Sequence, residues 1–295
     1  MPKSKVFIAY TPDRVVGTRK VVAAFGMPDL KDRTVLIKPN FNTADPPPGS
    51  THNDTLRTVV EMIKEKEPKR VVVGDRSGPA KTSEVFREKG IFALSEELGF
   101  DCLVFDEMPS ERWTRIVPPE SHWRKGFLFA KPVLEADAVI GLCCLKTHQY
   151  GGHFTMSLKL ATGMVHRSNM TELHTSVFDQ RKMIAEINWA YKPLLMVMDG
   201  VEAFTHGGPM TGRRWRANLT FASSDRVALD AVGVAALKMH GTTAKVEKKR
   251  VFEHDQIRRA IELGLGATGP DEVELVPVDD ASAEACEKLG PYLER

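Results

Sequence analysis

The sequence of 295 residues has little cysteine, almost no net charge and no long apolar run. Its four cysteines form no C-x-x-C pair, which excludes a self-contained zinc or ferredoxin-type cluster motif. The 41 basic and 39 acidic residues give a net charge of +2, which excludes nucleic-acid binding through bulk charge. No run approaches the roughly 20 apolar residues of a membrane span, and the first apolar run is too short for a signal peptide. We therefore expect a cytoplasmic protein with free thiols and with neither a nucleic-acid nor a membrane partner.

Short apolar runs rich in β-branched residues alternate with segments of helical periodicity along most of the chain. This order is typical of an α/β protein that has a mostly parallel sheet with helices on both faces. We predict a single α/β domain over residues 1–295. A flap or subsidiary hairpin is expected within 108–131, and a variable C-terminal part within 240–295.

The stretch from Ala138 to Met164 is the most informative part of the sequence. An apolar run suited to a buried strand ends abruptly at Lys146-Thr147-His148, a glycine pair follows, and Lys159 lies in a segment that reads as helical. In open α/β sheets, ligands bind where the carboxyl ends of strands meet helix N-termini. The sequence therefore predicts a polar ligand site after this strand.

Four other predicted strands also end in polar or glycine-containing sequences. These endings are Lys38-Pro39-Asn40, Gly74-Asp75-Arg76, Asp199-Gly200 and Ser223-Ser224-Asp225. If the sheet is parallel, all of these groups face one crevice at its carboxyl edge. The residues that we predict to bind a substrate or anion there are Lys38, Asn40, Asp75, Arg76, Lys159 and Asp199. Structural alternatives remain open: Asn40 can brace the proline loop, Asp75 can hold Arg76 and the helix start, and Asp225 can cap a helix.

Lys146 and His148 are the candidate catalytic residues. A desolvated lysine can pair with a phosphate or carboxylate, or it can act as an acid or base. A histidine that titrates near neutral pH is suited to carrying a proton. We therefore predict that Lys146 holds an anion or exchanges a proton beside His148.

Histidines in the same region suggest a divalent metal as an alternative. The candidate ligands are His148, His153 and His174, and imidazole suits zinc, iron or nickel. Their spacing matches no specific metal signature, and a tetrahedral site needs further ligands. Hydrogen bonding or acid–base work by His148 is the competing interpretation, so the identity of any cofactor stays open.

Several short motifs recur in a characteristic order between Val35 and Met239. They are Lys38-Pro39-Asn40, Gly74-Asp75, Lys146-Thr147-His148, Ser157-Leu158-Lys159, Gly163-Met164-Val165, Asp199-Gly200, Gly208-Pro209 with Gly212, and Ser223-Ser224-Asp225 with Ala228 and Asp230. As a set they resemble the domain of unknown function 362 family. The resemblance implies a cytoplasmic prokaryotic α/β protein.

The sequence departs from this family in two respects. Many relatives carry an appended ferredoxin module with two four-iron clusters, whereas the C-terminal region here holds one cysteine, Cys286. We therefore expect no intrinsic iron–sulfur cluster. Relatives commonly have a Lys-Asn pair after the central strand, where this chain has Lys159-Leu160.

Our first functional hypothesis is a small-molecule enzyme whose anionic substrate is held by lysines at strand ends, with His148 as acid or base. Redox chemistry with an external electron donor enters only through the resemblance. The alternative is a metal- or cofactor-binding protein that uses the segment His148–His174 without catalysis of its own. A third hypothesis is a partner of a separate redox protein, docked through the charged run Lys245–Arg250.

Overall fold

A computed structural model of the chain describes residues 2–295. Its strands are β1 (Ser4–Tyr10), β2 (Thr34–Pro39), β3 (Arg70–Asp75), β4 (Asp101–Val104), β5 (Trp113–Ile116), β6 (Phe127–Ala130), β7 (Ala138–His148), β8 (His153–Thr155), β9 (Leu195–Gly207), β10 (Gly212–Ser223) and β11 (Val273–Pro277). Its α-helices are α1 (Arg14–Phe25), α2 (Asn53–Lys64), α3 (Thr82–Glu88), α4 (Ile91–Leu98), α5 (Lys131–Glu135), α6 (Ser157–Leu160), α7 (Met170–Thr175), α8 (Gln180–Ile187), α9 (Arg226–His240), α10 (Ala244–Glu247), α11 (Asp255–Glu262) and α12 (Asp280–Leu293).

One nine-stranded sheet runs through the molecule in the order β11-β1-β10-β9-β7-β2-β3-β4, with β8 paired to β7 beside this path. The pairs β7–β9, β2–β7, β2–β3, β3–β4 and β1–β11 are parallel, whereas β10 is antiparallel to both of its neighbours. The predicted α/β class with a mostly parallel sheet is therefore confirmed. The carboxyl ends of β2, β3 and β7 lie at the same edge.

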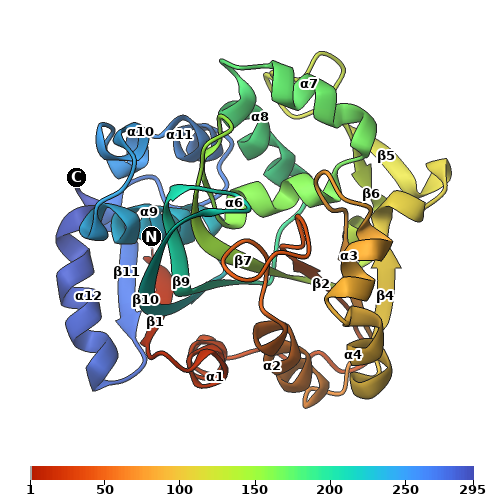
Figure 1. Ribbon diagram of the computed structural model, residues 1–295, viewed down its shortest axis with the longest axis horizontal. Helices are drawn as coiled ribbons and strands as arrows, with labels where there is room; N and C mark the ends of the chain where they lie inside the picture. The colour runs from red at the N-terminus through yellow and green to blue at the C-terminus, as the bar shows by residue number, and fades with distance from the viewer. Residues whose placement is uncertain (1) are drawn as a thin grey trace.

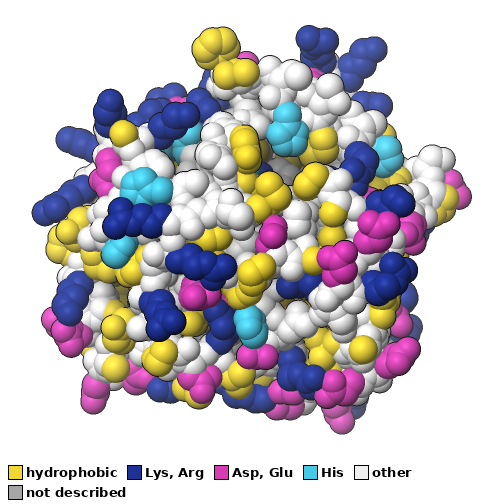
Figure 2. Space-filling model, viewed as in Figure 1, with side chains coloured by type: hydrophobic (Ala, Val, Ile, Leu, Met, Phe, Trp, Pro, Cys, Tyr) yellow, Lys and Arg dark blue, Asp and Glu magenta, His cyan; other side chains and the backbone are white. Residues whose placement is uncertain are grey.

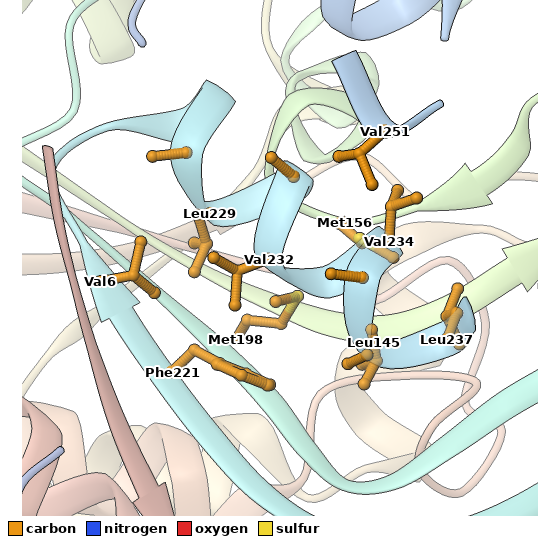
Figure 3. Close-up of a cluster of buried hydrophobic side chains, with 14 of the residues drawn as sticks. Val6, Leu145, Met156, Met198, Phe221, Leu229, Val232, Val234, Leu237 and Val251 are labelled. Carbon is orange, nitrogen blue, oxygen red and sulfur yellow. The ribbon is translucent and has the colours of Figure 1, made fainter. Parts of the chain in front are cut away.

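Helices cover both faces of the sheet (Figure 1). On one face, α1, α2, α3 and α4 bury a core with the sheet residues Val35, Ile37 and Ile140. On the other face, helix α9, which is buried from Arg226 to Lys238, is central, and Figure 3 shows its Leu229, Val232 and other apolar side chains against Met198 and Phe221 of the sheet. Alternate residues of the buried strands serve the two cores, which explains why the strands read as continuous apolar runs.

β9 and β10 form a longer hairpin than the sequence indicates. The apolar patterns predict short strands at 194–198 and 219–222 with a glycine-rich loop at 205–212. Instead, β9 continues to Gly207 and β10 begins at Gly212, with register shifts along the pair. The extension projects past the edge of the sheet and brings the turn at 208–211 toward the ends of β2 and β7.

The remaining segments lie outside the central strands. β5 and β6, which come after β4 and before β7 in the chain, form a separate antiparallel pair. In the C-terminal part, β11 adds an edge strand beside β1, and α12 packs on α9 and β1. None of the helices in residues 2–295 combines the length and the apolar character needed to cross a membrane.

Candidate functional site

A cavity of about 380 Å³ opens at the carboxyl ends of β2, β3 and β7. The predicted site residues that line it are Lys38, Asn40, Asp75, Arg76, Lys146, His148, Lys159 and His174. Figure 2 shows a hollow near the centre of the viewed face, between the positions of α6 and α7 in Figure 1. Residues from well-separated parts of the chain thus meet at one place because three parallel strands end there.

Lys38 and Asp75 form a buried ion pair on the floor of the cavity. The Lys38 ammonium lies 2.5 Å from Asp75 Oδ1, and both side chains are almost fully buried. Asp75 also accepts hydrogen bonds from the backbone N–H groups of Phe41 and Arg76. Burial lowers the pKa of Lys38, and the Asp75 carboxylate opposes that shift. Asp75 therefore orients Lys38 and neutralises it, so this pair adds little net charge to the cavity.

Lys146 is fully buried, and no carboxylate oxygen of residues 2–295 lies within 4.0 Å of its ammonium, although the charge of Asp45 acts on it from further away. Its ammonium donates to two backbone carbonyls, Gly49 O at 2.5 Å and Pro209 O at 3.1 Å. Because burial disfavours the charged form, the pKa of Lys146 is lowered. Two carbonyls hold the group in place without cancelling its charge, which leaves an attraction for an anion.

Lys159 lies on α6 beside His148. Burial, followed by the positive charges of Lys146 and Arg76, lowers the pKa of Lys159 to about 8. Gly152 makes the close approach of the two side chains possible, because a Cβ added there would lie 3.2 Å from both the His148 ring and Lys159 Cε. Lys159 therefore exchanges a proton near neutral pH, which suits a general acid or base.

His148 is 6% exposed, and its Nδ1 has no hydrogen-bond partner in the described chain. Burial, and next the charge of Lys159, lowers the pKa of His148 well below its usual value. The imidazole is consequently neutral at pH 7. A neutral imidazole carries one acceptor nitrogen and one donor nitrogen, and the buried Nδ1 lies on the side of the ring that faces Gly152.

Arg76 offers the cavity its positive charge, because its hydrogen-bond donors are used within the protein. Its guanidinium donates to the carbonyls of Val165, Ser77 and Thr162, and Nη2 also contacts Met170 Sδ at 3.1 Å. Arg76 is 6% exposed, and its guanidinium has no carboxylate oxygen within 4.0 Å in residues 2–295; burial lowers its pKa, and the more distant charges of Asp106 and Asp75 oppose that shift. Arg76 therefore ties β3 to the segment after α6 and adds positive potential to the cavity that it lines.

Two further polar atoms at the cavity lack partners in residues 2–295. They are Asn40 Oδ1 and Thr155 Oγ1, and both are buried. Asn40 donates its backbone N–H to Thr51 Oγ1, so its side chain does not brace the loop through that bond. Buried polar groups normally have partners, so these atoms mark positions for a polar ligand or for water.

Asp230 of α9 fixes the start of α6. Its carboxylate accepts hydrogen bonds from the backbone N–H groups of Ser157 and Leu158 and from the Ser157 hydroxyl. Burial raises the pKa of Asp230 to about 7. An inward-facing carboxylate at this position needs partners, and α6 supplies them. Asp230 thereby sets the place of Lys159 two residues further on.

Asp199 does not belong to the cavity. Its carboxylate lies 2.6 Å from Arg14 Nε and also accepts from Thr55 Oγ1 and the backbone N–H of Val201. The prediction placed it at a strand end, but β9 continues to Gly207, so Asp199 is an interior position. The ending Ser223-Ser224-Asp225 fails for a related reason, since antiparallel β10 ends at the opposite edge. Asp225 instead caps α9 through the N–H groups at 227 and 228.

The three predicted metal ligands do not come together. His148 and His174 both line the cavity, but His153 is absent from its lining. Burial, and next the positive charges of Arg181 and Lys245, lowers the pKa of His153 to about 4. Nowhere in residues 2–295 do three His, Cys, Asp or Glu side chains form a group that could hold a metal ion. His153 and His148 are paired in the β7–β8 ladder, but only His148 lines the cavity.

Some lining residues were not selected from the sequence. Arg167 lines the cavity and pairs with Asp106 at 2.9 Å. Met170 and Leu173 lie one turn apart on α7, and Met210 lies in the β9–β10 turn. The i, i+3 spacing on α7 was an available signal, whereas nothing local marks Met210. Its place depends on the length of the hairpin.

Residues 35–235 match the family described as Domain of unknown function (DUF362). The chain belongs to this family. The DUF362 match covers β2 to α9, and it therefore includes all the strands that build the cavity.

One curated relative and one solved structure are similar to this DUF362 protein. A thylakoid-associated protein of Synechocystis sp. is 27% identical over 215 residues, which is 71% of this chain and 64% of the relative. The chain thus spans less than two thirds of that relative's length. The lactate racemase apoprotein of Thermoanaerobacterium thermosaccharolyticum shares the fold with a TM-score of 0.50 at 13% identity, over 98% of this chain and 86% of that one.

Proposed function

We propose that this protein is an enzyme that acts on a small organic anion, most suitably a carboxylate, bound in the cavity. The observation that carries the proposal is the excess of positive charge that lines the cavity. Arg76, Lys146 and Lys159 line the cavity without a carboxylate partner in residues 2–295, whereas its single acidic side chain, Asp75, is paired with Lys38. Buried unpaired charges are costly, so a ligand anion is their natural counter-ion.

The geometry suggests a division of roles. Lys146 is held by two carbonyls and would position and neutralise the anion, while Arg76 adds field strength. His148 is neutral and has a free ring nitrogen, so it would accept a proton or a hydrogen bond from the substrate. Lys159, with a pKa of about 8, would exchange a proton next to it. Proton transfer close to a bound anion is therefore the reaction type that we propose.

The comparisons support the coarse form of this proposal. The racemase that shares the fold acts, by its name, on lactate, which is a small carboxylate. At 13% identity the likeness concerns the fold, so the choice of substrate depends on the cavity itself. A resident metal is not part of the proposal, because the residues of this cavity provide no three-ligand group of His, Cys, Asp or Glu.

The test measures anion binding and proton exchange in the same protein. We expect calorimetry at pH 7 to show binding of acetate and lactate that is lost, at least tenfold, in Lys146→Ala and Lys159→Ala. Lys245→Ala, an exposed lysine outside the cavity, is the matched control and should bind normally.

Proton NMR in deuterated water then monitors exchange at the carbon next to the carboxylate. The protein should catalyse exchange for a suitable carboxylate, and His148→Ala should lose exchange while it still binds. Unchanged affinity in both lysine variants would refute the anion site. Unchanged exchange in His148→Ala would refute the role of His148.

A further inference from the structure

The cavity has an apolar side that a small inorganic anion would not use. Leu160 of α6, Met170 and Leu173 of α7, and Met210 of the β9–β10 turn line it together with the cationic groups. We refer to these four side chains as the apolar wall. Figure 2 shows hydrophobic side chains gathered around the hollow on this face.

The cavity is also larger than a carboxylate head group requires. Its volume of about 380 Å³ is equivalent to about a dozen waters at roughly 30 Å³ each. A carboxylate has three non-hydrogen atoms. A ligand with only that head group would leave most of the apolar wall in contact with trapped water, which forfeits the hydrophobic contribution of the wall.

The polar and apolar sides adjoin each other. Arg76 Nη2 lies 3.1 Å from Met170 Sδ, so the apolar wall begins directly beside a buried cation. Met170 and Met210 are half-buried, and methionine adapts its shape to varied apolar partners. A charged group and an apolar chain of the same molecule can therefore be accommodated at once.

We infer that the substrate of this site is an amphipathic anion: a carboxylate or similar head group that bears an apolar arm of several carbons. The head group lies at Lys146 and Lys159, and the arm lies along the apolar wall. This inference rests on the proposed function, and it identifies a class of substrate larger than lactate.

The experiment measures affinity against chain length. Straight-chain carboxylates from acetate to octanoate are titrated into the full-length protein by calorimetry at pH 7. We expect each methylene buried on the apolar wall to tighten binding roughly fourfold, since about 0.8 kcal/mol accompanies each one. The gain should level off once the arm fills the cavity.

Two variants connect this gain to the apolar wall. Met210→Ser and Met170→Ser should each flatten the dependence on chain length. Met62→Ser provides the matched control, because Met62 is a half-buried methionine on α2 against the other core. Its dependence on chain length should equal that of the unchanged protein.

The outcomes separate this inference from the proposed function. Equal affinities from acetate to octanoate would overturn the inference and leave the anion site intact. A slope that persists in both methionine variants would also overturn it, because the arm would then lie elsewhere. Failure of every carboxylate to bind would overturn the proposed function together with the inference.

Discussion

At the scale of single residues, Lys159 is a cationic group of this cavity that titrates not far from neutral pH. Its pKa of about 8 results from burial and then from the charges of Lys146 and Arg76. The ammonium predominates below pH 8, and the neutral amine predominates above it. An anion gains attraction only from the charged form, so binding should weaken as pH rises through 8.

We therefore predict that affinity for a small carboxylate falls by up to tenfold per pH unit above about pH 8. Calorimetric titrations between pH 6.5 and 9.5 measure this dependence. In Lys159→Arg the charge persists to higher pH, because arginine does not lose its proton in this range. The decline should move upward in that variant. A decline at the same pH in both proteins would assign the titration to another group.

Sequence patterns identify cavity residues correctly where the strand ends after them, and incorrectly where the strand continues. Lys38, Lys146 and His148 were selected because polar side chains interrupt buried runs, and all three line the cavity. The same reasoning selects Asp199, but its strand continues and its carboxylate forms an ion pair with Arg14. A polar residue inside a long strand and one at a strand end look alike in the sequence. Only the distant partner distinguishes them.

At the scale of elements, the site depends on two hairpins that project beyond the sheet. β7 continues into β8, and the β9–β10 turn packs against the β7 extension through Gln149 N–H to Gly208 O at 3.3 Å. Both extensions contain polar residues, so their patterns resemble loops. The apolar halves of these strands were predictable, whereas the polar extensions become strands only by pairing with each other.

Gly208 tests the importance of this contact. It has φ of +76°, and a Cβ added there would lie 2.0 Å from Thr147 O. Gly208→Ala should therefore lower the free energy of unfolding by about 2–5 kcal/mol through left-handed strain and backbone overlap. It should also weaken carboxylate binding, because the carbonyl of Pro209 that holds Lys146 would move.

Gly241→Ala is the matched control for this prediction. Gly241 has φ of +93°, but nothing lies within 4 Å of an added Cβ. Its loss should be limited to the conformational cost of about 1–2 kcal/mol. Urea unfolding of both variants measures the difference. Equal losses would show that the hairpin contact does not contribute to stability.

At the scale of the whole molecule, the sheet includes strands that lie outside the family match. The match ends at residue 235, yet β10 within it pairs with β1, and β1 pairs with β11. The core around α9 also includes Cys286, Leu289 and Leu293 of α12. The edge strand and terminal helix were predictable from local patterns. The pairing of β11 with β1 was not predictable, because pairing between segments from opposite ends of the chain leaves no local pattern in the sequence.

Deletion of residues 273–295 tests whether this return is needed for folding. The deletion removes β11, one of the two strand partners of β1, and uncovers the α9 core, and fully burying each of Leu289 and Leu293 contributes roughly 1.5–3 kcal/mol. Because a protein is stable by only about 5–15 kcal/mol, we expect the shortened chain to lose its cooperative urea transition. Deletion of residues 294–295, whose side chains are exposed, removes the hydrogen bond from Val251 N–H to the Arg295 carbonyl and should lower the free energy of unfolding by only about 1 kcal/mol. A cooperative transition of normal midpoint in the 273–295 deletion would show that residues 1–272 fold independently, and that β11 and α12 are additions to a complete sheet.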